Sequence, residues 1–174
     1  MSYQELLSDA EWFCNQAETA KEGSPSEARF STASILFSFI AIESFINNMM
    51  SDFASLPPGM FTPYEQGFLA EKAVDLAESG ANAGRFEVTN RKRYWSLETK
   101  VMFLVARFSG NTVDKGSTLW QKFEQAKDVR DLLTHPRKDT DAIPSPADAR
   151  MTLEVARDIV QLVSWNVWGK KVEF

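Results

Sequence analysis

The chain repeats one arrangement where helices are expected to begin, and this arrangement constrains its fold more than any other feature. A Ser or Thr is followed by Pro and, two positions later, by an acidic residue in Ser24–Glu27, Thr62–Glu65 and Ser145–Asp148. The hydroxyl caps the first turn, the proline fits the first helical position and the acid closes a capping box. Boxes without the proline begin at Ser2 and Thr118. The sequence therefore predicts a series of well-capped helices.

Apolar residues follow each start at spacings of three and four, and no segment shows sustained two-residue alternation, so we expect an all-α fold. The predicted helices run from Tyr3 to Lys21, Pro25 to Phe53, Pro63 to Glu78, Tyr94 to Phe108, Thr118 to Thr134 and Ala147 to Trp168. The second is apolar nearly all round and should be central. With 174 residues and 44% hydrophobic content, the chain is expected to form one domain, residues 1–174, as a bundle of five to six helices.

The chain contains one cysteine, Cys14, and one histidine, His135. These counts exclude an internal disulfide and the multi-His or Cys/His sites that hold zinc, so any metal site within one chain would have to be built from carboxylates. We expect no metal and no other cofactor. The formal net charge of −5 disfavours non-specific coating of nucleic acid and leaves room for a local basic patch.

Two features indicate a cytoplasmic protein without a membrane segment. Residues 1–10 are acidic and lack the basic and continuously apolar regions of a secretory signal. The most apolar stretch, Ile35–Ile46, is interrupted by polar residues and is shorter than the ~20 residues that span a bilayer. We therefore expect it to be a core helix.

The most informative segment lies in the predicted fifth helix. On a helical wheel, Leu119, Phe123, Ala126 and Leu133 form an apolar stripe that also contains Arg130. A guanidinium placed there requires a carboxylate, a ligand or another subunit as partner. The alternative is a salt-bridged or snorkelling arginine that is purely structural.

His135 lies four residues after Asp131, so the two share a helix face, and Pro136 is expected to end the helix. An imidazole at a helix C-terminus beside a carboxylate is favoured in its protonated form and held for proton transfer. A capping histidine without a catalytic role would produce the same pattern.

The segment Arg130–His135 resembles the signature of HEPN (higher eukaryote and prokaryote nucleotide-binding) domains, which is an arginine, a polar residue, a short gap and a histidine. As in that family, the motif ends a late helix before a final one. Ala41–Asn47 and Ser96–Val101 also resemble helices of the family, and the resemblance covers roughly residues 31–165.

The resemblance implies an up-and-down helical bundle and a metal-independent endoribonuclease of a toxin–antitoxin or abortive-infection system. It implies that Arg130 and His135 are catalytic, with Asp131 beside the arginine. Cleavage by the RNA 2′-hydroxyl requires a base and an acid, and a homodimer would bring two histidines to one cleft. The implied partners are RNA, a second copy of the chain, and an antitoxin or nucleotidyltransferase. The alternative is a non-catalytic HEPN module that binds a nucleotide or a protein.

Three further residues are candidates for supporting the site. Glu43 and Asn47 lie four apart on the predicted central helix and either complete the site with Arg130 or form a buried structural network, which we favour. A Glu43–Arg130 pair with no further role is the third reading of the chain. Thr134 precedes the histidine and is expected to support it.

Two basic groups are predicted to contact RNA. They are Arg91, Lys92 and Arg93 in the long connection before the fourth helix, and Arg137 and Lys138 after the histidine. Tyr94 and Trp95 follow the first group and would add base stacking to phosphate contact. The alternative is that these basic residues belong to solvated loops and do not bind RNA.

Overall fold

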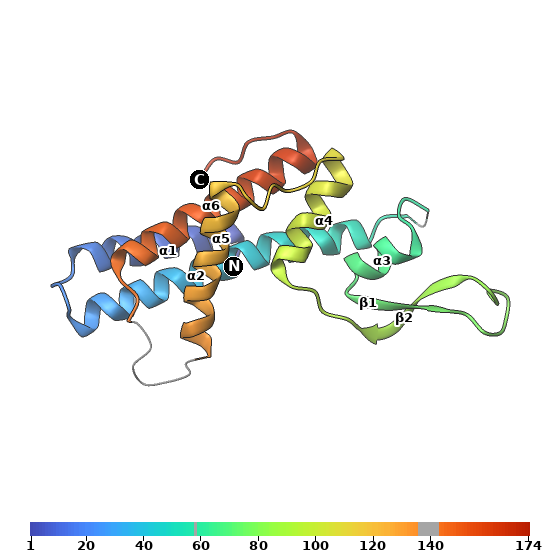
Figure 1. Cartoon of the computed structure of the whole chain (residues 1–174), viewed down its shortest axis with the longest axis horizontal. Helices are drawn as coiled ribbons and strands as arrows, with labels where there is room; N and C mark the ends of the chain where they lie inside the picture. The colour runs from blue at the N-terminus through green and yellow to red at the C-terminus, as the bar shows by residue number, and fades with distance from the viewer. Residues whose placement is uncertain (58, 136–142) are drawn as a thin grey trace. The chain divides into compact units, whose positions relative to one another are not determined.

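The computed structural model describes residues 1–57, 59–135 and 143–174, whose elements are labelled in Figure 1. The elements in chain order are α1 (Tyr3–Thr19), α2 (Pro25–Ala54), α3 (Pro63–Leu69), β1 (Lys72–Leu76), β2 (Phe86–Lys92), α4 (Leu97–Ser109), α5 (Thr118–Thr134) and α6 (Pro146–Trp168). The chain divides into two compact units, residues 1–45 with 102–174, and residues 46–101. That residues 1–174 form a single domain stays a prediction.

At Ser24 the hydroxyl accepts the predicted N–H of Glu27 at 3.2 Å, while the Glu27 carboxylate accepts the N–H of Gly23. Complete capping boxes form at three other helix starts. The hydroxyls of Ser2, Thr62 and Ser145 each accept the backbone N–H three residues on, and the acid there accepts the N–H of the cap in return. Each cap stabilises its helix by about 1 kcal/mol. At α5 the cap is Ser117 instead of the predicted Thr118, because the Ser117 hydroxyl accepts the N–H of Trp120. The α5 helix nevertheless begins at the predicted residue.

The prediction of one helix over residues 63–78 and of a wholly α fold was wrong in the second unit. The described residues form a mostly helical protein with a small antiparallel sheet, in which Val74 of β1 lies opposite Val88 of β2 and Leu76 lies opposite Phe86. The pairing between distant residues outweighs the helix propensity of the β1 sequence.

Two residues shape the junction between α3 and β1. Gly67 faces β1 so closely that a Cβ at this position would overlap the side chain of Val74. Glu71, two residues after the helix, has a φ of +51°, which ends the helical path. The hairpin packs against α3, and Tyr64 and Phe86 join the two with their ring centroids 5.0 Å apart.

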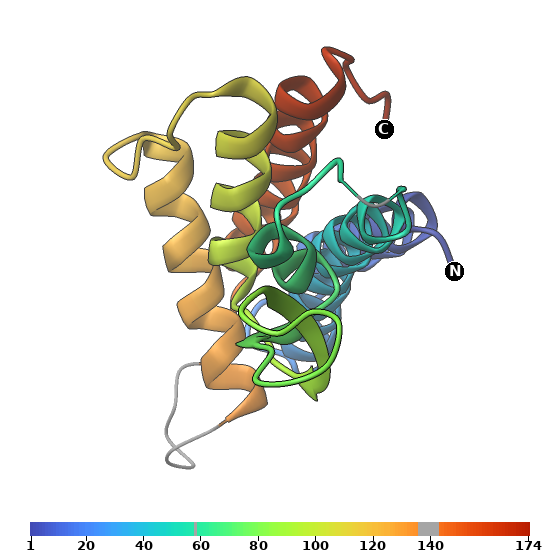
Figure 2. The ribbon, with the colours of Figure 1, turned by 90° about the vertical axis from the view of Figure 1, so that its right-hand side faces the viewer.

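In the first unit, α6 packs against both α1 and α5. Figures 1 and 2 show α5 crossing α6 steeply. The core side chains with 2% exposure or less include Leu7, Ile35, Ile42, Leu104, Trp120, Phe123, Leu153 and Ile159. The predicted central position of the second helix is thus confirmed for residues of α2 in this unit.

The helix α2 is long and apolar enough to cross a membrane by length and composition. Half of its most apolar window is buried inside the protein, and the expectation of a core helix stays a prediction.

Candidate functional site

The end of α5 has the conformation that the sequence predicts. The helix ends at Thr134, and His135 follows with φ −135° and ψ 63°, which is outside the helical region, as favoured for a residue before proline. The His135 N–H donates to the carbonyl oxygen of Asp131 at 2.9 Å. The side chain of His135 is exposed, so its imidazole lies in solvent at the negative end of the helix dipole.

Arg130 lies on the buried side of α5, as the helical wheel predicts, and its side chain is 25% exposed. Its guanidinium carbon lies 5.0 Å from the ring centroid of Phe39 on α2. Two carboxylates flank it, with Nη2 3.7 Å from Glu43 Oε1 and Nε 3.3 Å from Asp131 Oδ1. The expected proximity of Glu43 and Arg130 is confirmed.

The guanidinium of Arg130 makes no hydrogen bond within residues 1–57, 59–135 and 143–174. Its Nε is buried without a hydrogen-bond partner, although Asp131 Oδ1 lies 3.3 Å away, and Glu43 Oε1 is too far from Nη2, at 3.7 Å, for a hydrogen bond. Buried arginines are normally hydrogen-bonded, often in bidentate pairs with carboxylates. The Arg130 guanidinium is therefore held by the ring of Phe39 and by two long ion contacts. Its N–H donors have no acceptor among the described residues.

A hollow of about 510 Å³ adjoins the end of α5. Among the described residues it is lined by Asp128, Asp131, Leu132 and His135, whose spacing of three and four puts them on one face of the helix. The shared face of Asp131 and His135 is thus confirmed. Arg130 does not line this hollow, because five residues separate it from His135 and turn it about 140° around the helix axis. Asp131 lines the hollow together with His135, and its carboxylate also contacts the Arg130 guanidinium.

Two of the expected supporting residues have other partners. The Thr134 hydroxyl donates to the carbonyl oxygens of Arg130 at 3.1 Å and Asp131 at 3.3 Å, so it bonds to the helix backbone. The Oδ1 of Asn47 accepts a hydrogen bond from Lys100 Nζ at 2.8 Å. Asn47 thus takes part in a structural network with a buried lysine, which is the alternative favoured for it, and its support of the site stays a prediction.

The first basic group is not a free loop. Arg91 and Lys92 belong to β2, and Nη2 of Arg91 lies 2.6 Å from both carboxylate oxygens of Asp75. The Arg93 guanidinium lies 4.3 Å from the ring centroid of Trp95. Two of the three cations thus have partners within the second unit. Of the remaining side chains, Lys92 is exposed and Tyr94 is 72% exposed.

The second basic group, Arg137 and Lys138, lies outside the described residues, as does Pro136. Their expected contact with RNA stays a prediction.

One buried cation in the second unit was not predicted from the sequence. Lys100 is only 7% exposed and pairs with Glu71 across 2.6 Å. The available signal was its position directly before the apolar run Val101–Val105, where a lysine has no solvated face to occupy.

Searches with protein-family models, among curated proteins and among solved structures found no match to this chain. Within the described residues, no three His, Cys, Asp or Glu side chains form a group that could hold a metal ion. The assignment of function therefore depends on the geometry at the end of α5 and on the Arg130–His135 motif.

Proposed function

We propose that the chain is a metal-independent endoribonuclease of the HEPN type, in which Arg130 and His135 act on the scissile phosphate. The observation that carries this proposal is the Arg130 guanidinium, which is three-quarters buried and has no hydrogen bond among the described residues. A phosphate oxygen is the acceptor that such a planar donor set fits best. The exposed imidazole of His135 supplies the proton-transfer group at the same helix end.

The reaction uses the RNA's own nucleophile. The 2′-oxygen attacks the adjacent phosphorus as a base removes its proton, and the bond from phosphorus to the 5′-oxygen breaks as an acid protonates that oxygen. The products are a 2′,3′-cyclic phosphate and a 5′-hydroxyl. In this scheme His135 transfers protons, and Arg130 stabilises the charge that gathers on the phosphoryl oxygens.

We infer that the working enzyme is a homodimer. One chain contains a single histidine, whereas the reaction needs a base and an acid at the same time. In one chain Arg130 and His135 also point to sides of α5 that are about 140° apart. A two-fold axis near the α5 ends would bring both motifs to one cleft. Such an enzyme fits a cytoplasmic toxin–antitoxin or phage-defence system, regulated by an antitoxin or a nucleotidyltransferase.

The purely structural reading of Arg130 is less favoured by the geometry. A buried arginine that only stabilises the fold is expected to be held by close hydrogen bonds, which offset the loss of its hydration. The Glu43 carboxylate is 3.7 Å away and 45% exposed, so this ion pair contributes little.

The test is cleavage of a mixed-sequence RNA in EDTA by the purified protein. We expect the wild type to cleave, and we expect His135→Ala and Arg130→Met each to lose at least about 100-fold in rate, which is typical of a lost acid–base or charge-stabilising group. Gln125→Ala is the matched control, because Gln125 is an exposed residue of the same helix. Its rate should equal that of the wild type.

Two outcomes would overturn the proposal. Equal cleavage by the wild type and His135→Ala would exclude a catalytic role for the histidine. RNA binding by the wild type without cleavage, weakened by Arg130→Met, would instead identify a non-catalytic binding module.

A further inference from the structure

One face of α2 in the first unit is left open by the helices that pack around it. At 100° per residue, this face covers an arc of about 120°. We name it the α2 seam, and its residues are Arg29, Ala33, Leu36, Phe37, Ile40 and Glu43. Arg29 is exposed, Ile40 is 47% exposed, and Leu36 and Phe37 are only partly buried.

Other faces of the same helix are packed. The Ser34 hydroxyl donates to the carbonyl oxygen of Ala10 on α1 at 2.8 Å. The ring of Phe39 stacks on Phe123 of α5, with the ring centroids 6.4 Å apart. The α2 seam lies between these two contacts, on the side of the helix that faces away from the core.

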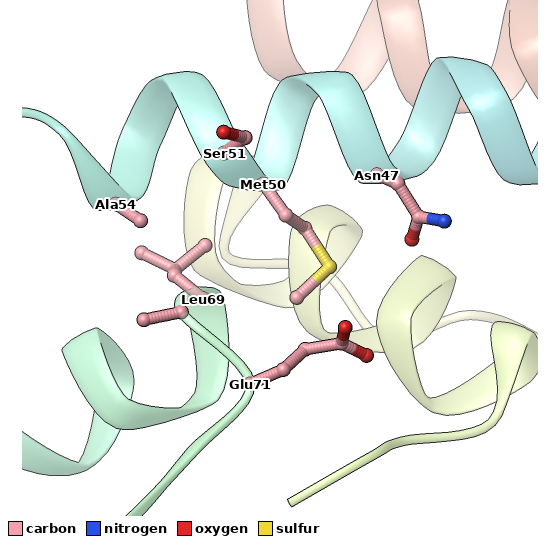
Figure 3. A pocket seen from close by; sticks show the side chains of 7 residues that line it. Asn47, Met50, Ser51, Ala54, Leu69 and Glu71 are labelled. Atoms are coloured by element: carbon pink, nitrogen blue, oxygen red, sulfur yellow. The ribbon is translucent and has the colours of Figure 1, made fainter. Parts of the chain in front are cut away.

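The middle of the α2 seam is apolar, which is unusual for the outer face of a helix. Ala33, Leu36, Phe37 and Ile40 follow one another at spacings of one, three and four over two turns, as in a stripe that packs against another helix. The next residues at this spacing, Asn47 and Ser51, are polar and line a pocket of about 370 Å³ in the second unit (Figure 3). A contiguous exposed apolar patch of this kind marks an interaction surface.

The two ends of the α2 seam carry opposite charges that are available to a partner. Among the described residues, Arg29 makes no hydrogen bond or ion pair. The Glu43 carboxylate is 45% exposed, and its 3.7 Å distance to Nη2 of Arg130 is too long for a hydrogen bond. A binding partner should therefore present a carboxylate at one end and a cation at the other.

A second copy of the chain meets these requirements when its α2 runs antiparallel. A two-fold axis between Leu36 and Phe37 pairs each residue with one equally far on the other side of the axis. At 1.5 Å per residue, Arg29 and Glu43 lie about 11 Å and about 10 Å from the level of the axis, so the Arg29 of each copy meets the Glu43 of the other.

The same axis matches the apolar side chains in size. Ala33 and Ile40 lie about 5 Å from its level on opposite sides, so a small side chain faces a large one, as in closely packed helix pairs. A parallel copy would instead place Arg29 against Arg29 and Glu43 against Glu43, and like charges that face each other are costly.

We propose that the α2 seam is a two-fold interface with a second copy of this chain, antiparallel and centred between Leu36 and Phe37. For the role of the dimer, this inference rests on the proposed function. The partner subunit's Arg29 neutralises Glu43, so the donors of Arg130 stay available to a phosphate. Phe39, on which Arg130 lies, is near the axis, so the two Phe39 residues are within about 10 Å of each other along the helix direction.

Sedimentation velocity of the purified chain without RNA tests the interface. The α2 seam spans only about 20 Å, so a weak dimer with a Kd of about 10 µM is expected, and a range from about 1 to 300 µM covers its dissociation. Ile40→Glu should weaken the dimer at least about 100-fold, because it buries two unpaired charges in the interface. Trp165→Glu is the matched control, since Trp165 is 55% exposed on α6 and lies outside the α2 seam. Its Kd should equal that of the wild type.

A charge exchange tests the register and the direction of the pairing. Arg29→Glu and Glu43→Arg should each weaken the dimer about 10-fold, because each places like charges together at both ends of the interface. The double variant Arg29→Glu with Glu43→Arg restores both pairs and should return to within about 3-fold of the wild-type Kd. The urea midpoint verifies that each variant is folded.

The inference is overturned if the wild type stays monomeric over this range, if Ile40→Glu dimerises like the wild type, or if the double variant dimerises no better than the single ones. These results do not depend on RNA. A dimer that responds as expected and does not cleave RNA would contradict the proposed function and leave the interface in place.

Discussion

Replacing Arg130 by Met separates a functional arginine from a structural one. The substitution keeps a long apolar side chain against Phe39 and removes the charge. The lost cation–π contact is worth about 0.5–2 kcal/mol, and each ion contact less than about 1 kcal/mol, because the Glu43 and Asp131 carboxylates are 45% and 43% exposed and become hydrated. Against this, a three-quarters buried guanidinium without hydrogen bonds no longer has to be desolvated.

We therefore expect the free energy of unfolding to fall by about 1 kcal/mol or less, while RNA cleavage is lost. Urea titration monitored by tryptophan fluorescence should show a midpoint shift of about 0.5 M. Phe123→Ala provides the comparison on the same helix, because this side chain is 0% exposed and its truncation should cost about 3–5 kcal/mol. A loss of 3 kcal/mol or more in Arg130→Met would refute the reasoning and identify the arginine as structural.

Three further predictions concern stability. A double-mutant cycle of Phe39→Leu with Arg130→Met should give a coupling of about 0.5–1 kcal/mol in urea titrations, and zero coupling would contradict the stacked arrangement. The hydrogen bond from Arg150 lowers the pKa of Glu18, so this carboxylate stabilises the fold above its ordinary pKa of about 4.5 and stops doing so as the pH falls through the lowered value. Glu18→Gln should thus cost less than about 1 kcal/mol at pH 7, since the carboxylate is 42% exposed, and a cost that persists in acid would be inconsistent with this pair. Burial raises the pKa of the Asp158 carboxyl group above 3.8, so the stability that its neutral form contributes is fully present below pH 3.8 and is lost as the pH rises through the raised pKa. Asp158→Asn should therefore raise the urea midpoint slightly at pH 7 and not at pH 3. An equal gain at both pH values would contradict this assignment.

The local features of the chain could be predicted from its sequence. Capping boxes act within four residues, so the starts of α1 and α3 follow from Ser2 and Thr62. The bounds of α5 follow from its apolar spacing and from the proline at position 136. The same periodicity placed Arg130 on the buried side of its helix.

Features that depend on distant residues were missed. The β1 sequence Lys72–Leu76 contains good helix formers, and only its pairing with β2 makes it a strand. Apolar and polar residues alternate in Phe86–Thr89, as in a strand, but this run is too short to outweigh the helix preference of Lys72–Leu76. At the site, the face of Phe39 that carries Arg130 depends on how α2 and α5 pack, which no local pattern specifies. The pairing of Lys100 with Glu71 depends on a left-handed residue that no turn motif predicted.

The most direct test of the central claim is end-group analysis of RNA cleaved in EDTA by the wild-type protein. The proposed attack by the 2′-hydroxyl predicts 2′,3′-cyclic phosphate and 5′-hydroxyl ends, and no cleavage at a site where that nucleotide is 2′-deoxy. Both products should disappear with His135→Ala. Ends carrying a 3′-hydroxyl and a 5′-phosphate, or unchanged cleavage at the 2′-deoxy site, would contradict the mechanism assigned to Arg130 and His135.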